Sequence, residues 1–443
     1  MSSRRRVHGR WGVVTVVALG ALTGLGGCTS GPDAGTAPSA SAAATASAAS
    51  EDPAGTARTT AAISDLLRAR AAAVVAGDEE AFAETVADGS SPAGRRQLDS
   101  FTAARALRVS RLEVGPPTVD GALTAPTASA TSPQRVRARA EVRYRVDDLD
   151  RGDRAARLEY DLVRTGAGWR VEAERPVGAG ATAPWVAMPT LRVRRGEHGV
   201  VAGTVPLARL TEHAADVDRA LPGLGGQWEH SPAQVLVLAP ATEVEADALL
   251  GRAAGSARSP VAATTEGPTG ADGTATGDRV VLDPTAFDRL TRSGRDVVLA
   301  HELAHVAVRA TVPGHPAGWL AEGYADHVGY RRADVSTRRL LAPLAAAVRA
   351  DRAPSALPSA SELQPGIGDL EVPYLASWQA VELLAERHGE AALRRLVAAG
   401  SSTGSEADAE ATTDRALVSE LGTTRAELTR QWLARLGRLG TTG

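Results

Sequence analysis

Two different spacings of apolar residues predict the first folded part of the chain. Over residues 57–87, apolar positions recur every three to four residues with a break at Gly77-Asp78, which predicts a long helix followed by a short one. From Val136 to Val146, apolar residues alternate with charged ones, as in a strand with one buried face. Residues 158–173 predict a hairpin, because two more alternating runs flank the turn sequence Thr165-Gly166-Ala167-Gly168. The pattern therefore predicts helices packed on an antiparallel sheet.

This order of elements resembles the cone-shaped domain of the nuclear transport factor 2-like (NTF2-like) superfamily, in which helices precede a curved antiparallel sheet. The resemblance covers residues 58–183 and implies an α+β fold. Because no paired Asp and His stand out in this segment, we expect a spacer or a binding module. The arginines of strand 136–146 could bind an anion, but such a run more often forms the solvated face of a sheet.

A second pattern begins near Trp185, where short apolar runs and amphipathic stretches alternate. The expected elements are strands at 191–193, 235–238 and 279–282 and helices at 212–221 and 243–250. Residues 252–278 are rich in Gly, Ala, Thr and Ser, so we expect a disordered surface insertion there. From Trp378 to Trp432, apolar residues recur at helical spacing, which predicts an all-helical C-terminal lobe.

The N-terminus has the layout of a secretory signal. Four arginines within the first ten residues precede an apolar stretch from Trp11 to Leu25, which is too short and too glycine-rich for a comfortable membrane span. It ends in Leu25-Gly26-Gly27-Cys28, which resembles a bacterial lipobox and implies lipidation of Cys28 after removal of the signal peptide, residues 1–27. The composition of residues 28–57 is typical of a disordered tether. We therefore expect a lipid-anchored protein on the extracytoplasmic face of the cell membrane.

Composition narrows the chemistry of the folded part. The 49 basic and 52 acidic residues give a net charge of −3, so binding to nucleic acid is not expected. Cys28 is the one cysteine, which excludes an intramolecular disulfide and a zinc site made of thiolates. Any metal site must therefore use histidines and carboxylates.

A candidate metal site lies on a helix expected over Arg295–Ala310, which contains His301-Glu302-Leu303-Ala304-His305. Histidines four residues apart share one helical face, so both imidazoles can bind one zinc ion. Glu302 is offset from them, toward a water molecule that it could deprotonate. This is the arrangement that a zinc hydrolase needs.

A catalytic zinc site also needs a third protein ligand, either a histidine shortly after the helix or a glutamate on the next one. His315 is the loop candidate, and the metzincin pattern is absent because Val308 and Thr311 stand where it needs glycine and histidine. Residues 319–326 read Trp-Leu-Ala-Glu-Gly-Tyr-Ala-Asp, which resembles the glutamate helix of the gluzincin metallopeptidases, and most closely the peptidase MA-like group. The resemblance implies that Glu322 is the third ligand.

The same resemblance implies two further roles. Asp326, on the same helical face as the third ligand, would accept the free N–H of one zinc-bound imidazole. Tyr374, which precedes a helix, resembles the catalytic tyrosine of gluzincin aminopeptidases and would support the oxyanion of the tetrahedral intermediate, although a core tyrosine at a helix start fits the residue equally well. Tyr324, His327 and His388 are expected to be structural.

The sequence therefore predicts a membrane-anchored extracellular zinc metallopeptidase that cleaves peptides or proteins. Its zincin-type domain, residues 187–440, would join a small mixed sheet, the active-site helix, the glutamate helix and the helical lobe. An endopeptidase is favoured, because gluzincin aminopeptidases carry a Gly-x-Met-Glu-Asn strand and this chain has no asparagine and only Met1 and Met188. Two other classes stay open: an inactive zinc-binding cell-envelope lipoprotein that serves as a binding module, and a solute-binding lipoprotein in which the motif is accidental.

Overall fold

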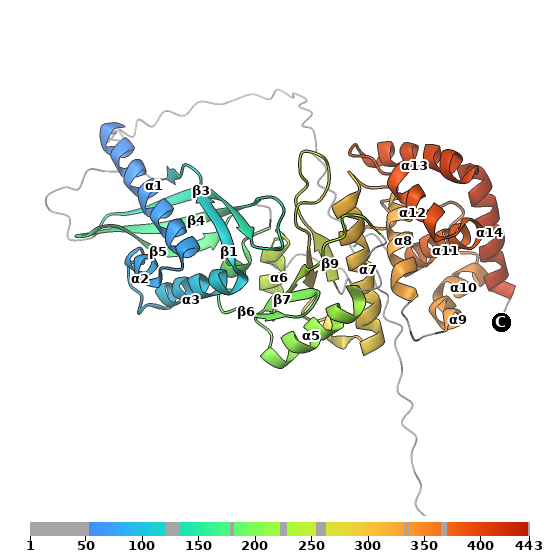
Figure 1. Cartoon of the computed structure of the whole chain (residues 1–443), viewed down its shortest axis with the longest axis horizontal. Helices are drawn as coiled ribbons and strands as arrows, with labels where there is room; N and C mark the ends of the chain where they lie inside the picture. Colours follow the sequence, from blue (N-terminus) through green and yellow to red (C-terminus); the bar gives the residue numbers. More distant parts are fainter. Residues whose placement is uncertain are drawn as a thin grey trace, which may run out of the picture.

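The computed structural model describes residues 53–120, 133–177, 181–221, 228–253, 263–331, 334, 336–364 and 370–441. The predicted signal peptide, Cys28 and most of the predicted tether lie outside these residues. Where the chain is described it is a mixed α+β protein with fourteen α-helices and two small sheets, which confirms the predicted class (Figure 1). Helix α1 (Pro53–Ala76) begins at a proline, a residue that suits the first helical position. Its start lies inside the predicted tether, so the predicted boundary at residue 57 is wrong.

The N-terminal unit, residues 53–177, packs three helices on a curled antiparallel sheet (Figure 1). Its elements are α1, α2 (Glu79–Glu84), α3 (Pro92–Leu107), β1 (Val109–Val114), β2 (Thr118–Asp120), β3 (Arg135–Val146), β4 (Arg154–Thr165) and β5 (Gly168–Pro176). The strand order is β1-β3-β4-β5, and β2 also pairs with β3. The predicted long and short helices, the alternating strand and the hairpin are all present.

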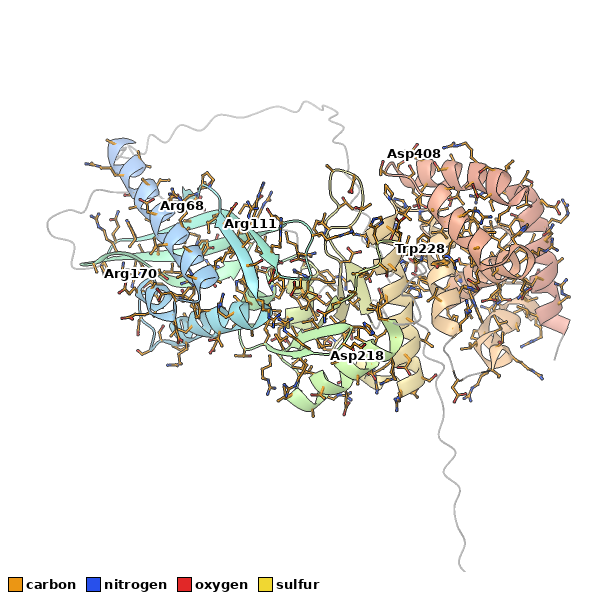
Figure 2. All side chains as sticks on the ribbon, viewed as in Figure 1. Arg68, Arg111, Arg170, Asp218, Trp228 and Asp408 are labelled. Atoms are coloured by element: carbon orange, nitrogen blue, oxygen red, sulfur yellow. The ribbon has the colours of Figure 1, made fainter. Side chains whose placement is uncertain are left out.

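The outer face of this sheet carries the arginines of β3. Arg139 pairs with Asp120 and Glu159, and Arg137 with Glu159 and Asp161. Side chains at the outer surface of the unit include Arg68, Arg111 and Arg170 (Figure 2). Because acidic neighbours neutralise these two β3 arginines, the face is the solvated side of a sheet and not a strong anion site.

The second sheet has parallel strands at its centre and antiparallel strands at both edges. The elements of this part are α4 (Pro184–Ala187), β6 (Arg192–Arg195), β7 (Gly199–Gly203), α5 (Leu207–Ala220), β8 (Val235–Ala239), α6 (Glu243–Leu249), β9 (Ala263–Glu266), β10 (Arg279–Leu282) and α7 (Arg292–Thr311). The order is β6-β7-β8-β10-β9, with β7, β8 and β10 parallel. Asp218 lies on α5 (Figure 2). Its carboxylate accepts hydrogen bonds from the backbone N–H groups of Glu197, His198 and Gly199, and these bonds fix the β6–β7 turn.

The central strands are apolar at successive positions because both faces of the sheet are covered. Val201 and Val237 point into the core with α5 and α7, whereas Val200 and Leu236 belong to the core of the N-terminal unit. Trp185, at the junction, packs edge-on against Tyr144 of β3 with ring centroids 4.8 Å apart. The N-terminal unit therefore shares its hydrophobic core with one face of the second sheet, and the other face packs into a separate core with α5 and α7.

The prediction of a disordered insertion over 252–278 is wrong for residues 263–278. Residues 263–266 form β9, which pairs antiparallel with β10, and a bridge joins Thr269 to Ala275. The low-complexity composition hid a short strand that is ordered by its pairing with β10.

The C-terminal part is an all-helical lobe beside α7, as predicted (Figure 1). Its helices are α8 (Gly318–Tyr330), α9 (Thr337–Leu340), α10 (Ala342–Arg349), α11 (Glu371–His388), α12 (Glu390–Ala399), α13 (Glu406–Leu421) and α14 (Arg425–Thr441). Across all the residues that the structure describes, no helix combines the length and apolarity needed to cross a membrane.

Candidate metal centre

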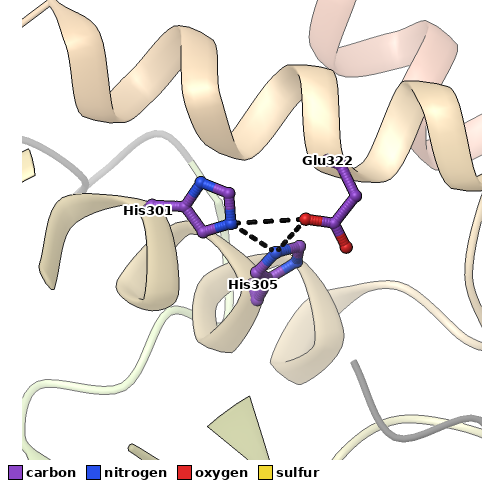
Figure 3. A group of neighbouring side chains, drawn as sticks. All are labelled: His301, His305 and Glu322. Atoms are coloured by element: carbon purple, nitrogen blue, oxygen red, sulfur yellow. Dashed lines mark hydrogen bonds and ion pairs between the residues drawn. The ribbon is translucent and has the colours of Figure 1, made fainter. Parts of the chain in front are cut away.

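Helix α7 carries both histidines of the predicted site. Its N-cap Thr291 accepts a hydrogen bond from the backbone N–H of Gly294 (3.1 Å), and the helix ends at Thr311, two residues before the proline of Pro313-Gly314. The apolar residues of α7 pack against the sheet and against α8, so the His301 side chain is fully buried and that of His305 is 12% exposed. Both imidazoles face α8 (Figure 3).

Glu322 on α8 completes a triangle of donor atoms with the two histidines (Figure 3). Nε2 of His301 lies 3.2 Å from Nε2 of His305. Oε2 of Glu322 lies 3.3 Å from the first nitrogen and 3.5 Å from the second. This is the one group among the described residues that could hold a metal ion with three histidine, cysteine or carboxylate ligands.

The chemistry of the donor set fits a bound cation. Three lone-pair atoms converge on one point, and Oε2 of Glu322 is buried there with the two imidazole nitrogens as its close neighbours. Without a cation, the lone pairs of these three atoms repel one another unless at least one imidazole carries a proton on Nε2. A metal ion would satisfy all three atoms at once.

Asp326 orients His301 from behind. Its Oδ1 lies 2.9 Å from Nδ1 of His301, and both side chains are fully buried. The hydrogen bond holds the proton on Nδ1, so Nε2 faces Glu322 and His305. The predicted position of Asp326 one turn after Glu322 therefore places it where the imidazole needs it.

The pKa values of His301, Glu322 and Asp326 are set by burial and by nearby charges. Burial lowers the pKa of His301, but the hydrogen bonds to Asp326 and Glu322 outweigh burial and raise that pKa to about 10. Burial raises the pKa of Glu322, but the charge of His305 and the hydrogen bonds of both histidines bring it down to about 2. Burial raises the pKa of Asp326 to about 6 against the effect of His301. A metal ion that binds here must displace the proton on Nε2 of His301, while the proton on Nδ1 stays with Asp326.

Glu302, the predicted base, is fully buried between α7 and β9. Its Oε2 accepts a hydrogen bond from the hydroxyl of Thr265 (2.7 Å), while Oε1 has no hydrogen-bond partner among the described groups. Burial raises the pKa of Glu302, and the charges of the two histidines oppose that shift. The Thr265 hydroxyl thus fixes Oε2 of Glu302, and Oε1 is the oxygen that can accept a proton.

Tyr374 lies in the first turn of α11, close to the third ligand. Burial first, and then the negative charge of Glu322, raise the pKa of Tyr374 well above its usual value. The phenol also donates to the backbone oxygen of Leu363 (3.4 Å). Gly323 permits the close approach of α8 to α11, because a Cβ at that position would lie only 2.6 Å from the carbonyl oxygen of Ser377 on α11.

The other aromatic and histidine candidates are not among the three converging donors, although Tyr324 and His315 line the cleft next to them. Tyr324 accepts a hydrogen bond from Nε1 of Trp228 (3.0 Å), the residue labelled in Figure 2. The ring nitrogens of His327 contact Glu382 and Glu390, and His388 is exposed at the end of α11. His315 lies in a loop with Nδ1 donating to the oxygen of Pro316 (3.1 Å), and it does not join the donor triangle.

A cleft of about 300 Å³ opens beside the triangle. Its lining includes His305 and Glu322, together with Glu406 at the start of α13. Thr269 and Gly273 contribute another side. We call residues 267–278 the wall segment, because they run from β9 past this cleft to β10. A ligand in the cleft would therefore lie against both the metal ligands and the wall segment.

Two features of the site were absent from the sequence prediction, namely the Thr265 hydroxyl at Glu302 and the wall segment. The available signal was the pair of β-branched residues Thr264-Thr265 ahead of the expected strand at 279–282. The surrounding glycine, alanine and threonine concealed it. No protein-family model matches the chain, and no curated protein matches it in sequence.

Proposed function

We propose that the protein is a zinc metallopeptidase, anchored by a lipid at Cys28 and working outside the cell membrane. The observation that carries the proposal is the convergence of His301, His305 and Glu322 on one point, with the Glu302 carboxylate beside them on the same helix. The anchor and the location rest on the N-terminal sequence alone.

The spacing of the donor atoms favours zinc. A tetrahedral ion with bonds of about 2.0–2.1 Å needs ligand atoms about 3.3–3.4 Å apart. The three distances here are 3.2, 3.3 and 3.5 Å. Two imidazoles and one carboxylate are also the ligand set of zinc hydrolases, which keep one position open for water or substrate.

The residues around the triangle supply the remaining parts of a peptide hydrolysis. A bound zinc ion would supply Lewis-acid chemistry, polarising the scissile carbonyl and activating water. Oε1 of Glu302 would take the proton of the attacking water and pass it to the leaving amine, while Thr265 holds Oε2. The Tyr374 phenol keeps its proton, so it would donate a hydrogen bond to the oxyanion.

A peptide is the substrate class that suits the surroundings. Among the described strands, β9 pairs only with β10, so its other edge carries backbone groups available to an extended chain. The strand runs past the proposed base, because the Thr265 hydroxyl of β9 contacts the Glu302 carboxylate. The arrangement resembles a zincin-type domain, and the N-terminal unit resembles an NTF2-like domain in its order of helices and strands.

The test combines zinc content with turnover. Purified protein should contain about one zinc ion per chain and cleave members of a broad peptide library. Glu302→Gln should keep the ion and lower turnover by about 10²- to 10⁴-fold, because it removes the proton acceptor and keeps the shape. Glu386→Gln, on an exposed residue paired with Arg435, is the matched control.

The outcomes separate the candidate functions. Zinc with no cleavage of any peptide would favour the inactive zinc-binding module instead. Protein that stays metal-free when zinc is offered would contradict both. Cleavage by Glu302→Gln at the wild-type rate would rule out Glu302 as the base.

A further inference from the structure

The N-terminal unit grips the wall segment through the turn between β3 and β4. The backbone N–H groups of Arg151 and Gly152 both donate to the carbonyl oxygen of Thr276, at 2.6 and 3.1 Å. Gly152 permits this approach, since a Cβ there would lie 2.8 Å from the Thr276 side chain. Arg154 adds a hydrogen bond from Nη1 to the oxygen of Gly277 (2.7 Å).

The Arg151 side chain joins the wall segment to the helix of the metal ligands. Its Nη2 donates to the oxygen of Ala275 (2.6 Å) and to the oxygen of Ala310 (2.9 Å). Ala310 lies in the last turn of α7, where carbonyl groups lack helical partners and a cation opposes the negative end of the helix dipole. One guanidinium from the N-terminal unit thus caps the active-site helix and fixes the base of the wall segment.

A buried ion pair also joins the turn between β3 and β4 to strand β10, where the wall segment ends. Arg279 of β10 contacts Asp150 at 2.9 Å, with both side chains 2% exposed. Arg279 also donates to the hydroxyl of Tyr144 (2.9 Å). Because β10 pairs with β9, the junction is connected through the sheet to the hydroxyl of Thr265 at Glu302.

We propose that the N-terminal unit is a working part of the site, and that Arg151 is a positioning residue that holds the wall segment against α7. The backbone N–H of Ala275 also donates to the oxygen of Arg309, and that of Gly314 to the oxygen of Gly273. Loss of the guanidinium would therefore loosen the cleft side that carries Thr269 and Gly273 without releasing it, whereas the metal ligands on α7 and α8 would keep their positions. The effect on turnover rests on the proposed function. The effect on the order of the wall segment does not.

The experiment measures amide hydrogen exchange and zinc content of the full chain as wild type, Arg151→Met, Arg151→Lys and Arg135→Met. Methionine keeps the aliphatic stem and removes the donors, and lysine restores a charged donor. Arg135, ion-paired to Glu172 on the outer sheet face, is the matched control. In Arg151→Met, amides of 267–276 should exchange about tenfold faster or more, with lysine intermediate, Arg135→Met unchanged and about one zinc per chain in all four.

Peptide cleavage gives a second readout. In Arg151→Met, kcat/KM should fall about tenfold at unchanged zinc content, since a loosened wall segment positions the substrate less precisely. Unchanged exchange of 267–276 in Arg151→Met, or an equal rise in Arg135→Met, would overturn the proposal. If the wild-type chain cleaves nothing, the proposed function fails while the exchange result still decides the role of Arg151.

Discussion

The two sides of the candidate centre are built in different ways. On the helical side, the ligands and the orienting acid lie within residues 301–326, on two adjacent helices. On the opposite side, Thr265 and the wall segment lie on an edge strand and its continuation, held by a unit whose Arg151 is 124 residues away from its partner Ala275. The first side depends on local helical spacing and the second on long-range contacts. We therefore expect changes to the ligands and the orienting acid on the helical side to alter metal binding, and changes on the strand side to alter turnover without loss of the metal.

The largest effect is expected from Glu322→Ala. It removes one of three ligands and leaves the two imidazoles to bind alone, so zinc affinity should fall by well over a hundredfold, more than the 10–100-fold typical of an orienting group. Equilibrium dialysis with elemental analysis measures this. Glu386→Ala, on an exposed surface residue, should bind zinc like the wild type. Stoichiometric tight zinc in Glu322→Ala would break the comparison, because the ligands would then lie elsewhere.

Asp326→Asn should lower zinc affinity by about 10- to 100-fold. The amide keeps the shape but loses the charge that holds the Nδ1 proton of His301. The same dialysis applies, and Asp216→Asn is a control for loss of a buried carboxylate remote from the triangle, since Asp216 is bound by Arg219 and Arg295. Equal affinities for Asp326→Asn and the wild type would limit Asp326 to a packing role.

On the strand side, Thr265→Val should leave zinc content unchanged and lower turnover about tenfold. Valine keeps the shape but removes the hydroxyl that holds Oε2 of Glu302. That bond favours the ionised carboxylate, so its loss should also move the acidic limb of kcat/KM to higher pH. Thr265→Ser, which keeps the hydroxyl, should restore both. Wild-type kinetics in Thr265→Val would contradict an orienting role for Thr265.

The same contrast explains what the sequence could predict. The motifs of α7 and α8 predicted their own geometry, because positions four residues apart on a helix share a face wherever the helix packs. The strand β9 was missed because a four-residue run has a weak pattern of its own and is ordered by its pairing with β10. Helix α3 was missed for another reason. Its buried face includes Gln97, whose Nε2 donates to the backbone oxygen of Glu172 (3.1 Å), so apolar spacing does not reveal that face.

The smallest effect is expected at His327, which links α8 to helices α11 and α12. Its ring nitrogens lie 2.8 Å from carboxylates of Glu382 on α11 and Glu390 on α12, and Arg331 also binds Glu390. Although burial lowers the pKa of His327, these carboxylates outweigh it and raise that pKa, while the pKa of Glu382 is lowered. A histidine with a raised pKa stabilises the fold fully below its unfolded value of 6.5, and this stabilisation is lost as the pH rises through the raised value. A glutamate with a lowered pKa stabilises above 4.5 and loses this as the pH falls.

The contribution of this clamp should therefore be greatest between about pH 4.5 and 6.5 and should decline on the alkaline side. His327→Gln should destabilise the chain by about 1 kcal/mol within that window and by less at higher pH, because glutamine cannot carry the charge. Chemical denaturation of both proteins at several pH values measures the difference. His388→Gln, at an exposed position, is the control. A pH-independent difference would mean that His327 acts through packing alone. Loss of zinc in His327→Gln would show that the helical side needs support from α11 and α12, and that its geometry is less local than its sequence spacing indicates.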